Sequence, residues 1–292
     1  MFEIVSKMRQ SPKLRTHAPS DVPASVRPSF DDVLADVILN DWVNAEYKRI
    51  RFAAPHPTSS AQAGQFFNIE CPATGEDQPY LRRPMSTYLA DPEVGELEFL
   101  YKVTGAGTRG LATLRPGMQT RLLGPLGNGF VLQPEWRNIV VLGRGVGLAT
   151  LAPLAELAAA RGVGVTALIS ARGREQVLSL DRFEAIDART EVVLDSDGTS
   201  GVEAVEARLR GYWQEGRADA FFTCGSNRLM LVMQMLAREL SIPGQVAMEQ
   251  QMACGLGMCF CCVRNFSVGG ETISRRVCWD GPVFDLSEAV SW

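Results

Sequence analysis

Short runs of alternating or apolar residues, broken by Gly and Pro, fill the first part of the chain from residue 34 to about residue 133. The runs cover residues 34–39, 47–52, 65–69, 96–103 and 119–123. Alternation with a period of two is the pattern of a strand that buries one face, and turn residues at this spacing are typical of all-β domains. The pattern predicts a small antiparallel β-barrel domain over residues 34–134.

Continuously apolar runs follow in the next part of the chain. They predict four buried strands, at residues 138–143, 163–170, 191–194 and 220–223, with helical segments between them. Strands that alternate with helices in this way indicate a doubly wound α/β domain, here over residues 135–248. The turn-rich residues 124–130 are expected to form a hinge between the two domains.

Residues 148–160 predict the first helix of the α/β domain. Pro153 is compatible with that helix only near its first turn, because proline removes a helical hydrogen bond further in. Glu156 interrupts the apolar run, which is also too short to cross a bilayer. No membrane span is therefore expected.

Residues 1–33 show no persistent apolar period and are rich in Ser, Pro, Lys and Arg. This composition predicts an N-terminal extension that lies outside the folded domains. A transit peptide is an alternative, although acidic residues offset the basic ones and no convincing amphipathic helix is visible. Nothing near the N-terminus resembles a secretory signal.

Composition limits the kind of chemistry to expect. At 292 residues and 46% hydrophobic content, the chain can bury the cores of two or three domains. A net charge of −4 offers no basic field for nucleic acid or for an anionic membrane. The only two histidines, His17 and His56, fall in tail and loop sequence, which argues against histidine catalysis or histidine metal sites. No catalytic side chain is assigned, and the chemistry is expected to come from cofactors.

Five of the seven cysteines crowd into residues 254–278. Four of them follow the C-x4-C-x2-C…C order of plant-type [2Fe–2S] sites. The predicted ligands are Cys254, Cys259, Cys262 and Cys278, in a C-terminal module of residues 249–292. Cys261 does not fit the spacing. Gly255 and Gly257 are expected to take positive φ, which lets backbone N–H groups point at the sulfur atoms.

Two other uses of these cysteines remain open. A structural zinc site usually shows two C-x2-C pairs, and this segment has one. Disulfides need an oxidising compartment, whereas clustered thiols suit a metal site in a reducing cytoplasm. The cytoplasm is therefore the expected location. Cys71 is expected to be a small buried hydrophobe.

Three segments have the composition of phosphate-binding loops. Residues 81–86 combine arginine, proline and a hydroxyl, which suits a loop that grips a phosphate and a flat ring. Residues 105–110 offer backbone N–H groups and the Thr108 hydroxyl at a helix start. The turn at Gly143, Gly145 and Gly147 follows a predicted strand as G-x-G-x-G, which differs from the G-x-G-x-x-G fingerprint. Each segment alone is also compatible with an ordinary surface turn.

Cys224 and Gly225 end the fourth predicted strand of the α/β domain, where the ligands of such sheets gather. Cys224 there is either close to a bound nicotinamide or a small buried hydrophobe. Residues 170–175 end the second strand and offer both an acid, as for a ribose hydroxyl, and arginines, as for a 2′-phosphate.

Over residues 34–292 the chain resembles the electron-transfer subunit of class 1B dihydroorotate dehydrogenase, within the ferredoxin–NADP reductase superfamily. Residues 83–86 look like the family's flavin-binding Arg-Pro-x-Ser, and 124–130 look like its Gly-Pro-Leu-Gly-x-Gly-Phe connection. The C-terminal segments 249–259 and 278–284 are similar to Glu-x-x-Met-x-Cys-Gly-x-Gly-x-Cys and Cys-x-Asp-Gly-Pro-Val-Phe. Three positions depart from the family pattern: Arg144, Thr150 and Ser226 stand for Gly, Pro and Pro.

The resemblance implies FAD, a [2Fe–2S] cluster on the four cysteines and NAD(P)H as electron donor or acceptor. The flavin contacts that it implies are Arg83, Pro84, Met85, Ser86, Leu100, Tyr101, Lys102, Gly107 and Thr108. The nucleotide contacts are Gly143, Gly145, Gly147, Cys224 and Gly225. The resemblance favours NADH, whereas Arg172 and Arg174 are also compatible with NADPH.

The implied function is electron transfer to or from a partner catalytic subunit, an FMN dihydroorotate dehydrogenase of pyrimidine biosynthesis. A hetero-oligomeric complex is expected, with Met252, Met258 and Phe260 on the shared surface. One alternative is a reductase component that serves an oxygenase, a demethylase or another redox enzyme. The other is a redox-sensing or scaffold protein without an enzymatic role.

Overall fold

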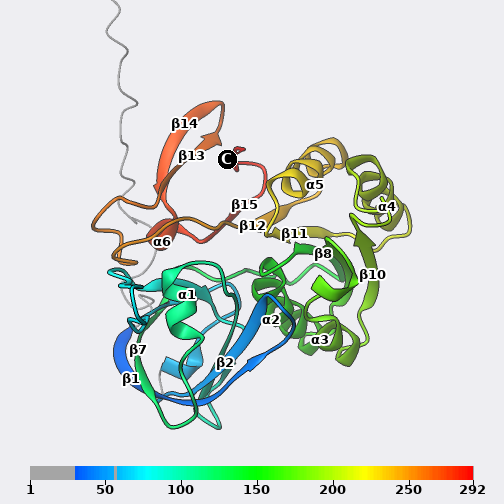
Figure 1. The fold of residues 1–292 in the computed structure, drawn as a ribbon. Coiled ribbons are helices and arrows are strands. Elements are labelled where there is room, and N and C mark those ends of the chain that lie inside the picture. Colours follow the sequence, from blue (N-terminus) through cyan, green and yellow to red (C-terminus); the bar gives the residue numbers. More distant parts are fainter. Residues whose placement is uncertain (1–29, 56–57, 292) are drawn as a thin grey trace, which may run out of the picture.

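The computed structural model describes residues 30–55 and 58–291. Most of the predicted N-terminal extension, with His17, lies outside these residues, as does His56. Figure 1 shows a barrel-like sheet in blue and cyan, an α/β layer in green and yellow beside it, and a small orange and red C-terminal part above the barrel. No helix of the described chain is long and apolar enough to span a membrane.

Seven antiparallel strands form the first sheet, in the order β4-β3-β7-β1-β2-β6-β5. They are β1 (Asp31–Trp42), β2 (Tyr47–Ala53), β3 (Phe66–Ile69), β4 (Arg83–Ser86), β5 (Leu89–Asp91), β6 (Glu96–Lys102) and β7 (Gln119–Leu126). The sheet curls around a core in which Phe52 and Phe67 pack edge-on against Phe99, at ring distances of 6.0 and 5.5 Å. All five runs predicted as strands are strands, because the alternating apolar residues bury one face.

Two segments that were predicted as loop and hinge are wholly or partly strand. Residues 83–86 form the edge strand β4, paired with β3, and not a loop. An edge strand tolerates Pro84 because only one of its sides takes part in the ladder. The predicted hinge 124–130 begins inside β7, which continues to Leu126. The short helices η2 (Thr58–Ser60) and α1 (Ala106–Leu111) connect strands of this sheet.

The α/β layer has a six-stranded sheet in the order β10-β9-β8-β11-β12-β15. Its parallel strands are β8 (Asn138–Arg144), β9 (Gly164–Ala171), β10 (Arg189–Leu194), β11 (Ala220–Cys224) and β12 (Gly244–Ala247). The connecting segments are α2 (Gly147–Ala160), η3 (Arg174–Gln176), α3 (Leu180–Ala185), α4 (Val202–Gln214) and α5 (Asn227–Leu240). Helices cover both faces: the core of one face contains Ile139 with α2 and α3, and that of the other contains Val140 with α4 and α5. The strand order reverses between β8 and β11, so the carboxyl ends of these two strands form the switch point.

Helix α2 differs from its prediction in one respect. It begins at Gly147, so that Pro153 is its seventh residue and lies beyond the first turn. Proline inside a helix costs ~3 kcal/mol. The helix continues because Leu151, Leu154 and Ala155 around the proline are fully buried, and this packing outweighs the local penalty.

The C-terminal part begins with the cysteine loop after β12. It continues through the hairpin β13 (Val263–Val268) and β14 (Glu271–Arg276) and the short helix α6 (Val277–Asp280). The chain then returns to the α/β sheet as β15 (Val283–Asp285), antiparallel to β12. The rings of Phe266 and Phe284 lie 4.3 Å apart in the shared core. The hairpin, β12 and β15 were not predicted.

Candidate functional site

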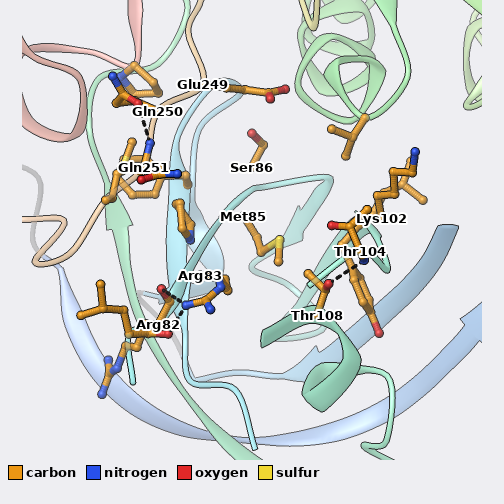
Figure 2. A pocket seen from close by; sticks show the side chains of 18 of the residues that line it. Arg82, Arg83, Met85, Ser86, Lys102, Thr104, Thr108, Glu249, Gln250 and Gln251 are labelled. Carbon is orange, nitrogen blue, oxygen red and sulfur yellow. Dashed lines mark hydrogen bonds between the residues drawn. The ribbon is translucent and has the colours of Figure 1, made fainter. Parts of the chain in front are cut away.

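A cavity of about 850 Å³ lies where the barrel meets the segment that follows β12. Eight of the nine predicted flavin contacts line it: Arg83, Pro84, Met85 and Ser86 of β4, Leu100, Tyr101 and Lys102 of β6, and Thr108 of α1. Figure 2 shows Met85 and Ser86 pointing into the same space as Glu249 from the other wall. The structure therefore gathers residues that are far apart in the sequence around one cavity large enough for a cofactor.

Arg83 and Gly107 form one unit at the edge of this cavity. A Cβ atom on Gly107 would lie 2.5 Å from Arg83 Nε, so a larger residue there would displace the Arg83 side chain from this position. Arg83 donates to the carbonyl oxygens of Leu81 and Arg82, and no carboxylate of the described chain forms an ion pair with it. The neighbouring Arg82, by contrast, forms an ion pair with Asp32. Arg83 thus keeps an uncompensated positive charge for a ligand.

Thr108 stabilises the turn that leads into α1. Its Oγ1 accepts hydrogen bonds from the backbone N–H groups of Thr104 (2.9 Å) and Gly105 (3.1 Å) and donates to the Gly105 carbonyl (3.1 Å). The side chain lines the cavity, but its hydroxyl is already engaged. A direct bond from this hydroxyl to a pyrophosphate remains a prediction.

The wall opposite β4 was not predicted. It consists of Met248, Glu249, Gln250, Gln251 and Met252, which follow β12. Glu249 opens onto the cavity, yet the surrounding protein removes enough water to raise the pKa of its carboxyl group. The signals in the sequence were the position of these residues directly before Cys254 and the family motif that begins at Glu249.

The turn between β8 and α2 meets the end of β11 at the switch point. Gly145 and Gly225 have φ values of +55° and +94°. A Cβ atom on Gly147 would lie 2.5 Å from the Cys224 backbone, and one on Gly225 would lie 2.2 Å from the Arg144 carbonyl oxygen. Of the predicted nucleotide glycines, Gly147 is therefore in direct contact with Cys224 and Gly225. Gly143 has another role, because a Cβ there would collide with the side chain of Leu148 at 2.5 Å.

Cys224 is buried beneath this turn with 4% of its surface exposed. Desolvation strongly raises the pKa of its thiol, so the side chain is neutral. This burial fits a small hydrophobe, and its contact with a nicotinamide remains a prediction. Cys71 is also buried, as predicted, and desolvation raises its pKa to about 11.

Two arginines near the nucleotide turn, Arg144 and Arg172, are paired with carboxylates, whereas Arg174 is exposed and forms no ion pair with a carboxylate of the described residues. Arg144 donates to Asp195 and, at 2.8 Å, to Ser170 Oγ, and its hydrogen bond is the main cause of the lowered pKa of Asp195. Arg172 pairs with Glu46 of the barrel, which also holds Lys102 at 2.6 Å. Glu46 thus joins the end of β9 to a lysine that lines the cavity.

The four predicted cluster cysteines lie in two pairs. Cys262 and Cys278 are buried, with their Sγ atoms 3.2 Å apart, and Cys254 is hydrogen-bonded to Cys259. No three His, Cys, Asp or Glu side chains of the described residues converge on a single ion. A [2Fe–2S] cluster needs four thiolates shared by two irons, and two pairs of thiols fit that donor set. Cys261 is exposed, with its Sγ 3.8 Å from the Gln251 carbonyl oxygen.

Hydrogen bonds favour ionisation of two of these thiols, Cys262 and Cys254. The contact with Cys278 lowers the pKa of Cys262 to about 6 and raises that of Cys278. Desolvation opposes ionisation of Cys254, but hydrogen bonds from Cys259 and the nearby backbone bring its pKa down to about 7. Thiolates are the form that binds iron.

The backbone of the loop behaves as the sequence predicts. Gly255 and Gly257 have φ values of +70° and +74°. The Gly257 N–H points at Cys278 Sγ, with a distance of 3.2 Å from nitrogen to sulfur. Both expectations for these glycines are confirmed.

The apolar side chains around the cysteine loop differ in their exposure to solvent. Met258 is 77% exposed, Phe260 44% and Trp279 42%. Met252, which was expected on the partner surface, is buried in the protein's own core, so that part of the prediction is wrong. The exposed apolar surface thus consists of Met258, Phe260 and Trp279.

Comparison with known proteins supports the division of the chain seen in the structure. Residues 35–130 match the family model described as the oxidoreductase FAD-binding domain. Residues 249–290 match the one described as the iron–sulfur cluster binding domain of dihydroorotate dehydrogenase B. The first covers the barrel and the second covers the cysteine loop, the hairpin and β15.

Among solved structures, the chain is similar to one from the NADH-dependent reduced ferredoxin–NADP oxidoreductase, studied for flavin-based electron bifurcation. The TM-score is 0.73 and the identity 27%, over 88% of this chain and 89% of that one. It is also similar to the Amycolatopsis cytochrome P450 reductase GcoB, with a TM-score of 0.58 and 25% identity, over 72% and 66% of the two chains.

Two relatives carry the name dihydroorotate dehydrogenase B (NAD(+)), electron transfer subunit. The protein of Desulforamulus reducens is 32% identical over 82% of this chain and 91% of its own length. That of Bacillus caldolyticus is 34% identical over 78% and 87%. The chain therefore belongs to the family of dihydroorotate dehydrogenase B electron transfer subunits, within the ferredoxin–NADP reductase superfamily.

Proposed function

We propose that this chain passes electrons between a nicotinamide nucleotide and a partner catalytic subunit, an FMN dihydroorotate dehydrogenase. FAD and a [2Fe–2S] cluster in the chain connect the two ends of the path. Two relatives are named as electron transfer subunits of an NAD(+)-linked dihydroorotate dehydrogenase, and the geometry of the cavity suits such a role. The reducing cytoplasm is the proposed location, since five clustered cysteines are present as free thiols.

One observation supports this function best: a single short segment serves both redox sites. Residues 248–252 line the cavity, and Cys254 follows two residues later. The cysteine loop also packs on the barrel, because a Cβ on Gly255 would lie 2.3 Å from Asn68 Nδ2 of β3. A flavin in the cavity and a cluster on the loop would therefore be neighbours.

The residues have the following proposed tasks. When bound, FAD exchanges a hydride with the nucleotide and single electrons with the cluster. Arg83 offers its free charge to the flavin or its phosphates, while β4 and β6 supply the walls. The closely packed turn of Gly147 and Gly225 at the switch point is the proposed binding place of the nucleotide. Cys254 with Cys259, and Cys262 with Cys278, hold the cluster.

Separation of the two activities tests this function. The isolated chain is expected to reduce ferricyanide with NADH, and to turn over dihydroorotate only when the FMN-bearing subunit of the same organism is added. Met258→Glu and Phe260→Glu should spare the ferricyanide rate and lower partner-dependent turnover by roughly tenfold, about 1.4 kcal/mol, because they place charge on the exposed apolar surface. Met235→Glu, at an exposed position on α5, serves as the control. Dihydroorotate oxidation by the chain alone would refute the division of labour.

A preference for NADH over NADPH is also expected. Arg144 and Arg172 are already paired with Asp195 and Glu46, so a 2′-phosphate would have to compete with a carboxylate of this chain. We expect kcat/KM to favour NADH by at least about tenfold, ~1.4 kcal/mol. Glu46→Gln should raise the NADPH/NADH ratio of kcat/KM, because it frees Arg172. A preference for NADPH in the unmodified chain would contradict this assignment.

A second function remains a candidate because of the similarity to the Amycolatopsis cytochrome P450 reductase. In that case the partner would be an oxygenase or a related redox enzyme. Purification of the complex from its native host, with identification of the bound subunit, distinguishes the two.

A further inference from the structure

Arg276 connects the separate parts of the cysteine site. It is the last residue of β14 and lies two residues before Cys278. Its Nε and Nη2 donate to Asp280 Oδ2 (3.1 Å) and Oδ1 (3.0 Å), and its Nη1 donates to the Gly257 carbonyl oxygen (3.2 Å). Its guanidinium also lies over the Phe260 ring, 5.6 Å from the centroid. One side chain thus binds the glycine loop, the Phe260 segment and the helix that carries Cys278.

These contacts bear directly on the Cys262–Cys278 pair. The Gly257 backbone N–H donates a hydrogen bond to Cys278 Sγ, and the Gly257 carbonyl oxygen accepts one from Arg276. The Arg276 backbone N–H bonds to Asp280 Oδ2 at 2.7 Å, which closes the turn of α6 around Cys278. Loss of the guanidinium would release the loop from that helix.

Charge acts in the same place. The Arg276 guanidinium places a positive charge close to the Cys262–Cys278 pair, because it bonds to Gly257 and to Asp280, whose segments both contact or carry Cys278. The side chain is 21% exposed, so water screens its charge only in part. A fixed cation next to two thiolates favours the more negative, reduced state of a cluster bound there. Removal of the guanidinium would also leave the Asp280 carboxylate without its cationic partner, so the net charge near the thiols would become more negative.

We propose that Arg276 is a positioning residue that fixes the Cys262–Cys278 half of the iron–sulfur site and raises its reduction potential. This inference rests on the proposed cluster. It assigns to Arg276 a role separate from that of the four ligands. Lysine would keep the charge but not the planar fork that binds both Asp280 and Gly257.

The neighbouring arginine provides a matched control. Arg275 lies on the other face of β14, where it pairs with Glu288 at 2.6 Å and lies 5.4 Å from the Phe266 ring centroid. It thus makes the same kinds of contact away from the thiols. Any general effect of losing an arginine from the hairpin should appear equally in Arg275→Gln.

The test compares the full-length unmodified protein with Arg276→Gln, Arg276→Lys and Arg275→Gln. Iron, acid-labile sulfide and FAD per chain are measured, with the EPR spectrum and midpoint potential of the reduced cluster. Arg276→Gln should lower the potential, alter the EPR line shape and reduce iron content, with FAD unchanged. Arg276→Lys should keep the potential of the unmodified protein, because it keeps the charge, while still altering the line shape. Arg275→Gln should match the unmodified protein.

The outcomes separate the two proposals. A full cluster with unchanged potential and line shape in Arg276→Gln would overturn the role of Arg276, and so would equal changes in Arg275→Gln. If Arg276→Gln holds no iron while Arg275→Gln does, the positioning role stands. The charge effect is then tested by Arg276→Lys alone, whose potential should equal that of the unmodified protein. A lowered potential in Arg276→Lys would refute the charge effect. Absence of iron and sulfide from the unmodified protein would instead refute the proposed function.

Discussion

Replacement of Cys262 by serine is expected to remove the [2Fe–2S] absorption and to abolish partner-dependent turnover. Cys262 is buried, and its Sγ lies 3.2 Å from that of Cys278, so the two thiols can hold one iron together. A serine hydroxyl is a poor substitute because it stays protonated at neutral pH. Visible absorption, together with iron and sulfide content per chain, measures the loss.

Cys261→Ser is the matched control for this experiment. Its thiol is exposed and points to the Gln251 carbonyl oxygen, so its removal should leave the cluster intact. The reduction of ferricyanide by NADH should survive in both variants because it needs only the flavin. Loss of the cluster in Cys261→Ser with retention in Cys262→Ser would show that the proposed ligand register is shifted by one residue.

Arg83→Ala is expected to yield protein that keeps its iron but loses FAD during purification. The Arg83 guanidinium lies against Gly107 and is free of any carboxylate in the described chain, so a ligand is its expected charged partner. A charged hydrogen bond contributes ~1.5–3 kcal/mol, which corresponds to roughly ten- to a hundredfold weaker binding. The FAD-to-iron ratio after desalting gives the result.

Arg109→Ala tests whether any arginine of this region would have the same effect. Arg109 is on α1 and bonds to Asp77 at 2.6 and 2.7 Å, outside the cavity. Its removal should leave FAD content unchanged. Normal FAD content in Arg83→Ala would exclude Arg83 from the flavin site.

Much of the fold could be predicted because its signals are local. The barrel strands alternate with a period of two, and the parallel strands β8 and β9 are continuously apolar since helices cover both of their faces. The cysteine spacing and the positive φ of Gly257 are also local properties. Each of these features depends on residues within a few positions of one another.

The remainder depends on contacts between distant residues. Pro84 suggests a loop until its edge position beside β3 is known, and Pro153 is tolerated inside α2 only because of the packing around it. The pair of Arg172 with Glu46 spans 126 residues of sequence. Glu249 becomes part of the cavity only when its segment crosses to the barrel. No local pattern encodes such pairings.

The return of the chain to the α/β sheet has a consequence for the four predicted ligands. Residues 248–282, which carry all four ligands, form an insertion between two strands that are direct neighbours, β12 and β15. Bringing together the ends of a free segment of this length costs about 3 kcal/mol of chain entropy. The pairing of β12 with β15 offsets that cost and fixes both ends of the segment. The four predicted ligands therefore lie on one segment that the nucleotide-binding sheet anchors at both ends, which confines the thiols to a small volume.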